Sequence, residues 1–147
     1  MKKIVVTLMA LLLLAISASA QRDLNCYPVF QGKVVPGKQM VVTEVRGSSM
    51  AAYKLDYYRG LSFHVDEALT RQVAALVEAD ADNAAVKETE KVGDLLTYAL
   101  VQPASTGKMN RYLCYQARKV GDKWRITLLY LEGAATLDDL RNMFDKQ

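Results

Sequence analysis

The sequence is poor in the residues that build most metal and catalytic centres: its 147 residues include one histidine, two cysteines and one tryptophan. A zinc site needs three or four nitrogen, sulfur or oxygen ligands at close spacing, and this set does not supply them. The alternating acids Glu78, Asp80 and Asp82 begin like a calcium loop, but the turn glycine and the final bidentate glutamate are missing. We therefore expect no metal and no cofactor.

Motifs for nucleophilic catalysis and nucleotide binding are also missing. Gly47-Ser48-Ser49 lacks the second glycine of G-x-S-x-G, and no G-x-G-x-x-G follows a strand. The only histidine, His64, has polar and apolar neighbours in alternation, which predicts a solvated strand residue. The net charge is only +3, so we expect no nucleic-acid partner.

Residues 1–20 have the pattern of a secretory signal peptide. Lys2 and Lys3 precede an apolar run over 4–16, and the small residues 18–20 form an A-x-A cleavage site. About 13 apolar residues are too few to span a membrane, and no later run is longer, so we expect no transmembrane segment after cleavage. The pattern predicts an exported protein, periplasmic or secreted.

Export affects the interpretation of the two cysteines, because oxidising compartments permit disulfides. Cys26 and Cys114 form the one pair that the sequence allows. In the alternative interpretation, Cys114 is a small buried residue of an apolar strand and Cys26 is free in the N-terminal segment.

The mature chain divides into a lead-in and one domain. Two prolines and two glycines within residues 21–38 predict an irregular lead-in that ends in a turn. Residues 39–147 have the length and patterning of a single domain.

Alternating and β-branched residues predict several strands. The clearest are 39–46, the stretch around 61–65, and 95–101. The ranges 111–120 and 123–131 flank Gly121-Asp122 and predict a hairpin. Residues 87–90 are expected to be a polar connection to a turn at Gly93-Asp94.

Two amphipathic helices complete the predicted architecture. Asp66 is a candidate N-cap for an apolar stripe that runs from Leu69 to Val77. Thr136 begins a second helix with Asp138 and Asp139 in its first turn. The expected fold class is α+β: a mostly antiparallel sheet of four to six strands with both helices packed on one face.

Several segments carry a resemblance to a group of proteins. These are 40–47, 57–61, 110–113, 126–133 and 135–137, which include the runs Asn-Arg-Tyr-Leu and Ile-Thr-Leu-Leu-Tyr-Leu-Glu-Gly. Over nearly all of the mature chain, the sequence resembles small exported Bacteroidota proteins of unknown function. The resemblance implies a Gram-negative envelope setting and assigns no site residue.

Tyrosine is the most suggestive feature of the mature chain, with eight residues against three phenylalanines. Tyrosine joins an apolar ring to a polar tip and is common in binding surfaces. Next to arginines such as Arg118 or Arg125, tyrosines on an uncovered sheet face would form a platform for a glycan, peptide or protein. In the alternative interpretation, tyrosine simply favours strands and these residues lie half-buried at the margins of the core. The candidate ligand-binding residues are Tyr98, Tyr112, Tyr115, Tyr130 and Arg111.

The sequence leaves three functional hypotheses. The first is an exported, non-enzymatic domain that binds a ligand or an envelope protein through its sheet face or the adjacent loops. The second is a small envelope hydrolase that uses paired carboxylates from among Glu44, Asp56, Asp66 and Glu132. The third is a structural or assembly factor of the envelope that pairs an edge strand.

Overall fold

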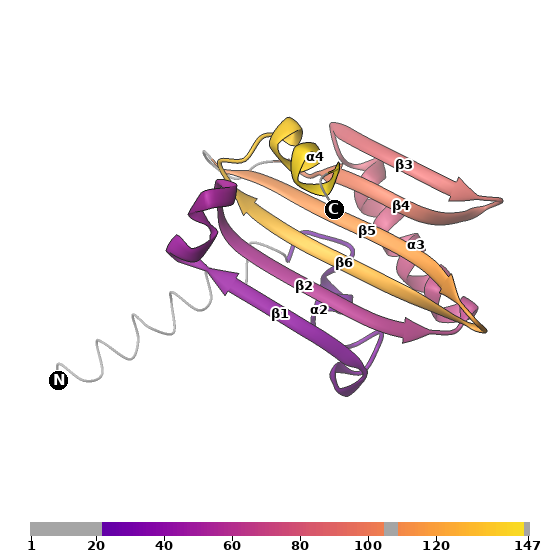
Figure 1. Ribbon diagram of the computed structural model, residues 1–147. Coiled ribbons are helices and arrows are strands. Elements are labelled where there is room, and N and C mark those ends of the chain that lie inside the picture. The colour runs from indigo at the N-terminus through magenta and orange to yellow at the C-terminus, as the bar shows by residue number, and fades with distance from the viewer. Residues whose placement is uncertain (1–21, 105–108, 146–147) are drawn as a thin grey trace.

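The protein is built around one antiparallel sheet of six strands, in the order β1-β2-β6-β5-β4-β3 (Figure 1). The computed structural model describes residues 22–104 and 109–145, so the predicted leader lies outside the described residues. The strands are β1 (Met40–Arg46), β2 (Leu55–Val65), β3 (Val86–Val92), β4 (Leu95–Gln102), β5 (Asn110–Val120) and β6 (Lys123–Gly133). The helices are α2 (Tyr27–Phe30), η1 (Gly37–Gln39), η2 (Gly47–Tyr53), α3 (Glu67–Asp82) and α4 (Leu137–Asp145).

The hairpin of β5 and β6 forms where the sequence predicts it. Its strands pair in continuous register from Asn110 opposite Gly133 to Val120 opposite Lys123. Gly121 has a φ of 64°, a left-handed conformation that glycine adopts without steric cost. The two-residue turn therefore fixes the register of the two central strands.

Side-chain caps begin both amphipathic helices. The Asp66 carboxylate accepts a hydrogen bond from the main-chain N–H of Leu69 at 2.9 Å and begins α3. At the start of α4, Asp139 accepts from the N–H of Thr136 at 2.8 Å, and the Thr136 hydroxyl accepts from the N–H of Asp139 at 3.2 Å. Both predicted helices are confirmed, as is the α+β class with a mainly antiparallel sheet.

The two helices lie on opposite faces of the sheet, so the expectation that both cover one face is wrong. In Figure 1, α4 lies in front of the sheet, and α2 and α3 lie behind it. Buried residues of α3 pack with Phe63 and Leu128, whereas Leu140 of α4 packs with Tyr112 and Cys114. We call the side covered by α3 the α3 face and the other side the open face.

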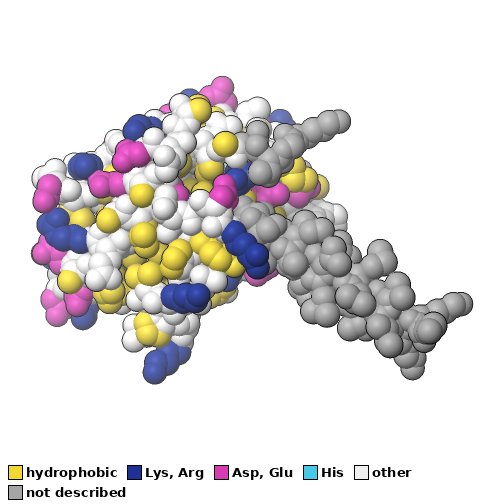
Figure 2. Space-filling model, turned by 180° about the vertical axis from the view of Figure 1, so that it is seen from behind, with side chains coloured by type: hydrophobic (Ala, Val, Ile, Leu, Met, Phe, Trp, Pro, Cys, Tyr) yellow, Lys and Arg dark blue, Asp and Glu magenta, His cyan; other side chains and the backbone are white. Residues whose placement is uncertain are grey.

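The segment expected to be an irregular lead-in is part of the core of the α3 face. It contains the one-turn helix α2, and it buries five side chains against the sheet and α3: Leu24, Cys26, Val29, Phe30 and Val35. Figure 2 shows the protein from this side, with acidic and basic side chains intermingled over the part of the face where α3 lies. The α3 face is thus covered by two separate parts of the chain.

A strand also occupies the stretch expected to be a polar connection. β3 pairs with β4 and forms one edge of the sheet, and most of its residues are exposed. This stretch has the composition of a loop, because four of its residues are charged: Lys87, Glu88, Glu90 and Lys91. Its strand conformation comes from pairing with β4. Within residues 22–104 and 109–145, no helix is both long and apolar enough to cross a membrane.

Candidate functional site

The described residues cover the open face at one end only. There, η2 and α4 lie over the sheet, and α4 is held by an ion pair of Arg141 with Glu88 of β3 and by one of Lys54 with Asp139 at 3.5 Å. Beyond α4, the surface of β4, β5 and β6 is hollowed to a volume of about 380 Å³. The hollow is lined by Tyr98, Cys114, Tyr115, Gln116, Arg118, Thr127 and Leu129.

Strand register arranges the lining of this hollow in rows. Tyr98 of β4 lies opposite Gln116 of β5, which lies opposite Thr127 of β6, and we call these three residues the polar row. The next row toward α4 is apolar and includes Cys114 opposite Leu129. Residues two apart on a strand share a face, so the hollow has a phenol, an amide and a hydroxyl beside an apolar floor.

A row of basic character follows on the side away from α4. Arg118 of β5 lies opposite Arg125 of β6, and Arg125 lies opposite His64 of β2. All three side chains are exposed, and Arg118 also lines the hollow. In the described parts of the chain, no ion pair joins either arginine to an acidic side chain. We call Arg118 and Arg125 the arginine pair.

The floor of the hollow does not offer a reactive thiol. Burial raises the pKa of Cys114 to about 12, so the side chain is a neutral thiol at physiological pH. Burial also raises the pKa of Tyr58, which packs at the covered end of the same face. Because the thiol is neutral, the described lining of the hollow provides hydrogen-bonding groups, positive charge and apolar surface but no reactive sulfur.

The structure divides the five predicted ligand-binding residues between the two faces and buries four of them. Tyr112, Tyr115, Tyr130 and Arg111 are at most 1% exposed, whereas Tyr98 is partly exposed. As a set they cannot form the expected exposed platform. The ring of Tyr115 belongs to the core of the α3 face, although the residue also borders the hollow. Of the five predicted residues, only Tyr98 contributes its side chain to the hollow.

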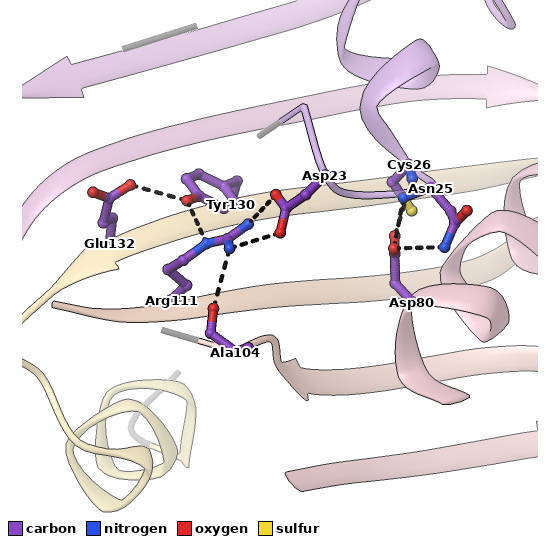
Figure 3. A network of polar contacts seen from close by, with 8 residues as sticks. All are labelled: Asp23, Asn25, Cys26, Asp80, Ala104, Arg111, Tyr130 and Glu132. Atoms are coloured by element: carbon purple, nitrogen blue, oxygen red, sulfur yellow. Dashed lines mark hydrogen bonds and ion pairs between the residues drawn. The ribbon is translucent and has the colours of Figure 1, made fainter. Parts of the chain in front are cut away.

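Arg111, which is itself buried, is the centre of a polar network on the α3 face (Figure 3). Its guanidinium forms a bidentate ion pair with Asp23 at 2.7 and 3.0 Å, and it also donates to the carbonyl of Ala104 and to the Tyr130 hydroxyl. The Tyr130 hydroxyl in turn donates to Glu132 at 2.9 Å. Hydrogen bonding by Arg111 lowers the pKa of Asp23. This arginine thus fastens the N-terminal segment to the sheet.

Asp80 near the end of α3 holds the same segment at a second point (Figure 3). Its carboxylate accepts hydrogen bonds from the main-chain N–H groups of Asn25 and Cys26 at 2.6 and 3.0 Å. Asp80 is buried, so these donors replace the water that its charge would otherwise bind. Neither partnership could be predicted from local sequence patterns, because the contacts join residues 55 and 88 positions apart.

Of the two interpretations of the cysteines, the disulfide between Cys26 and Cys114 is not formed, and both cysteines are free and buried. Cys26 packs in the core of the α3 face, and Cys114 packs in the core of the open face. The side chain of Cys114 points to the open face of its strand, whereas Cys26 lies on the α3 face, so the sheet lies between the two sulfur atoms. Burial raises the pKa of Cys26, and the nearby charge of Asp80 adds to that effect.

The four carboxylates considered for hydrolysis are dispersed over the fold. Asp66 caps α3, Glu44 pairs with Arg46 at 2.8 Å, and Glu132 accepts from Tyr130, while Asp56 is exposed. None of them lines the hollow. Among the residues with described positions, no three histidine, cysteine or acidic side chains gather as a metal site would require.

Comparison with known proteins gives a family but no characterised relative. No curated protein and no solved structure matches the chain. Residues 13–144 match a family of unknown function, DUF6108, and this match covers most of the sequence. The chain therefore belongs to the DUF6108 family.

Proposed function

We propose that this protein is exported and that, without catalysing a reaction, it binds a ligand in the hollow of the open face. The observation that carries the proposal is the polar row of Tyr98, Gln116 and Thr127 beside an apolar floor on the uncovered part of the sheet. Ligand sites combine apolar surface with a few polar groups that fix orientation, in volumes of about 300–1,000 Å³. The volume of about 380 Å³ lies within this range.

The lining residues favour binding over catalysis. Among the residues with described positions, the lining includes no carboxylate and no histidine, and its one thiol is neutral because it is buried. General acid–base chemistry needs a titratable group near the operating pH within reach of the substrate. The lining provides hydrogen-bond donors and acceptors instead.

The site also has a stable foundation. Its three strands β4, β5 and β6 are paired on both sides, and α3 and the N-terminal segment cover their opposite face. A binding surface on central strands keeps its geometry without the ligand. We therefore expect the hollow to be formed in advance of binding.

Nuclear magnetic resonance can test binding at the hollow. The protein is expressed from its full-length gene, labelled with nitrogen-15 and titrated with neutral sugars, sugar acids, amino acids and dipeptides. We expect one class to shift the amide signals of Tyr98, Gln116 and Thr127 in a saturable way. Tyr98→Ala should weaken that binding at least about fivefold through the lost ring contact.

Tyr53→Ala is the matched control, because Tyr53 is an exposed tyrosine of η2 that does not line the hollow. It should leave the affinity unchanged. The proposal fails if shifts for every probe fall elsewhere on the protein, or if the two tyrosine variants weaken binding equally.

The leader pattern of residues 1–20 and the resemblance to exported Bacteroidota proteins support the export part of the proposal. The setting we propose is the envelope of a Gram-negative bacterium. Expression in such a host should place the protein in the periplasm or the medium, and intact mass should show a chain that begins at Gln21. A cytoplasmic protein that retains Met1 would contradict export.

A further inference from the structure

The arginine pair places two like charges directly opposite each other at the rim of the hollow. Arg118 and Arg125 are register partners on β5 and β6, and His64 follows in register on β2. Like charges at directly opposite positions of an antiparallel pair destabilise the sheet. Local stability therefore gives no reason for this arrangement.

Several other basic side chains of the protein form ion pairs with acidic residues. Arg46 pairs with Glu44, Arg71 with Glu67 and Asp94, Lys87 with Asp82, and Lys91 with Glu78. Figure 2 shows the resulting mixture of acidic and basic side chains around α3. Within the described ranges neither arginine of the pair has such an acidic partner, and the neighbouring Lys119 and Lys123 have none either. Within the described residues, no ion pair therefore neutralises the two arginines at the rim of the hollow.

We infer that the hollow binds a sugar acid, with its carboxylate between Arg118 and Arg125 and its ring over Leu129 and Tyr98. This inference rests on the proposed function and names the ligand class for the same site. Guanidinium groups present paired N–H donors that match the two oxygens of a carboxylate. A bound carboxylate would also relieve the repulsion between the two arginines.

The polar row distinguishes a sugar acid from a purely apolar acid. A fatty or aromatic acid would cover Gln116 and Thr127 without offering them hydrogen bonds, and leaving covered polar groups unpaired is unfavourable. The hydroxyl groups of a sugar can pair with this amide and this hydroxyl. The C–H groups of the ring can pack on Tyr98 and Leu129.

Larger anionic partners fit the surface less well. The chain has a net charge of only +3, which does not provide the extended basic stripe of a nucleic-acid site. A peptide that adds a strand needs a free sheet edge, whereas β5 and β6 are paired on both sides. A small ligand held by side chains alone is the occupant that matches the central position of the hollow.

Glucuronate and glucose are suitable probes, because they differ in a carboxylate at one ring substituent. Each is titrated into the labelled full-length protein at equal ionic strength. We expect glucuronate to shift the amides of the polar row and of the arginine pair, and glucose to bind at least about tenfold more weakly. The double variant Arg118→Gln with Arg125→Gln should weaken glucuronate binding by a similar factor.

Lys119→Gln is the matched control for charge. Lys119 is exposed on β5 next to Arg118, and strand alternation directs its side chain to the other face. Its effect on glucuronate binding should stay within about twofold, as expected for a distant surface charge at moderate salt. Equal losses from Lys119→Gln and the double arginine variant would overturn the inference in favour of a diffuse charge effect.

The remaining outcomes separate this inference from the proposed function. Equal binding of glucose and glucuronate at the polar row would overturn the sugar-acid inference and leave binding at the hollow in place. Inorganic phosphate that shifts the arginine pair as strongly as glucuronate does would overturn it in favour of an unselective anion site. If no glucuronate binding is detected while another class of probe binds at the hollow, the inference is wrong and the proposed function holds. If all probes fail at the hollow, both are wrong.

Discussion

The two faces of the sheet differ in how completely the chain covers them. The α3 face is closed by a sixteen-residue helix and by the N-terminal segment, which Arg111 and Asp80 hold in place. On the open face, the part of the chain that the structure describes places η2 and the nine-residue α4 at one end and nothing over the rest. Most of the buried hydrophobic residues described belong to the α3 face, and the uncovered part of the open face leaves polar and charged side chains accessible. The same strands thus carry a core on one side and a candidate binding site on the other.

A substitution in the core of the α3 face should have the largest effect. Phe63 is buried between the sheet and the elements that cover this face. Phe63→Ala should lower the free energy of unfolding by about 3–5 kcal/mol, because it removes a large side chain and leaves a cavity. Chemical denaturation measures the change. Val41→Ala on the exposed side of β1 is the control and should cost less than about 0.5 kcal/mol.

The cover of the open face should contribute less. Leu140 is the fully buried residue through which α4 contacts Tyr112 and Cys114, and Leu140→Ala should cost about 2–4 kcal/mol in the same measurement. Asn142→Ala, on the exposed side of α4, is the control. A loss below about 0.5 kcal/mol for Leu140→Ala would mean that α4 does not pack on the sheet. The open face would then be even less covered than the α3 face.

The ion pair that fastens the N-terminal segment should make the α3 face sensitive to acid. Because Arg111 lowers the pKa of Asp23 in the folded protein, this carboxyl contributes stability above its unfolded pKa of about 4, and the contribution is lost as the pH falls through the folded pKa. Urea unfolding at about pH 6 and about pH 3 measures this loss. The difference in stability between the wild type and Asp23→Asn should shrink at the lower pH.

Asp122→Asn, in the exposed turn of the hairpin, is the control for that experiment. Its effect on stability should be the same at both pH values. An Asp23→Asn difference that is independent of pH would show that the ion pair with Arg111 does not anchor the segment.

The smallest expected change in folding stability is a gain and not a loss. Arg118→Glu replaces a like-charged pair on the open face with an ion pair to Arg125, so it should raise stability by about 0.2–1 kcal/mol. Lys119→Glu, next to it on β5, is the control and should stay within about 0.5 kcal/mol of the wild type. Thermal unfolding at low and high salt checks both variants. A loss of stability in Arg118→Glu would remove the argument that the arginine pair opposes folding.

Local features of the sequence predicted the main elements correctly. Gly121-Asp122 between alternating segments predicted the central hairpin, and Asp66 predicted the start of α3. These signals act within a few residues, because a turn conformation or a cap depends only on its neighbours in the chain. The α+β class followed from the sum of such elements.

Predictions that depended on the direction of side chains across the sheet were less successful. Residues 111–115 are all buried, because β5 is covered on both faces at this point, so alternation could not show which helix covers which side. For the same reason, Tyr112 and Tyr130 were expected to bind ligand although both are core residues. Of the candidate site, the sequence identified Tyr98 as a site residue and named Arg118 and Arg125 as arginines that could flank a platform. It did not identify Gln116 or Thr127, which have no distinctive local pattern.

By itself, the sequence determined the turns, the caps and the alternating strands, because these arise from interactions between residues close together in the chain. The tertiary structure decided which face each helix covers, which cysteine lies on which side, and which polar residues meet in the hollow. These outcomes depend on the register of strands that are far apart in sequence, where a shift of one residue exchanges the two faces.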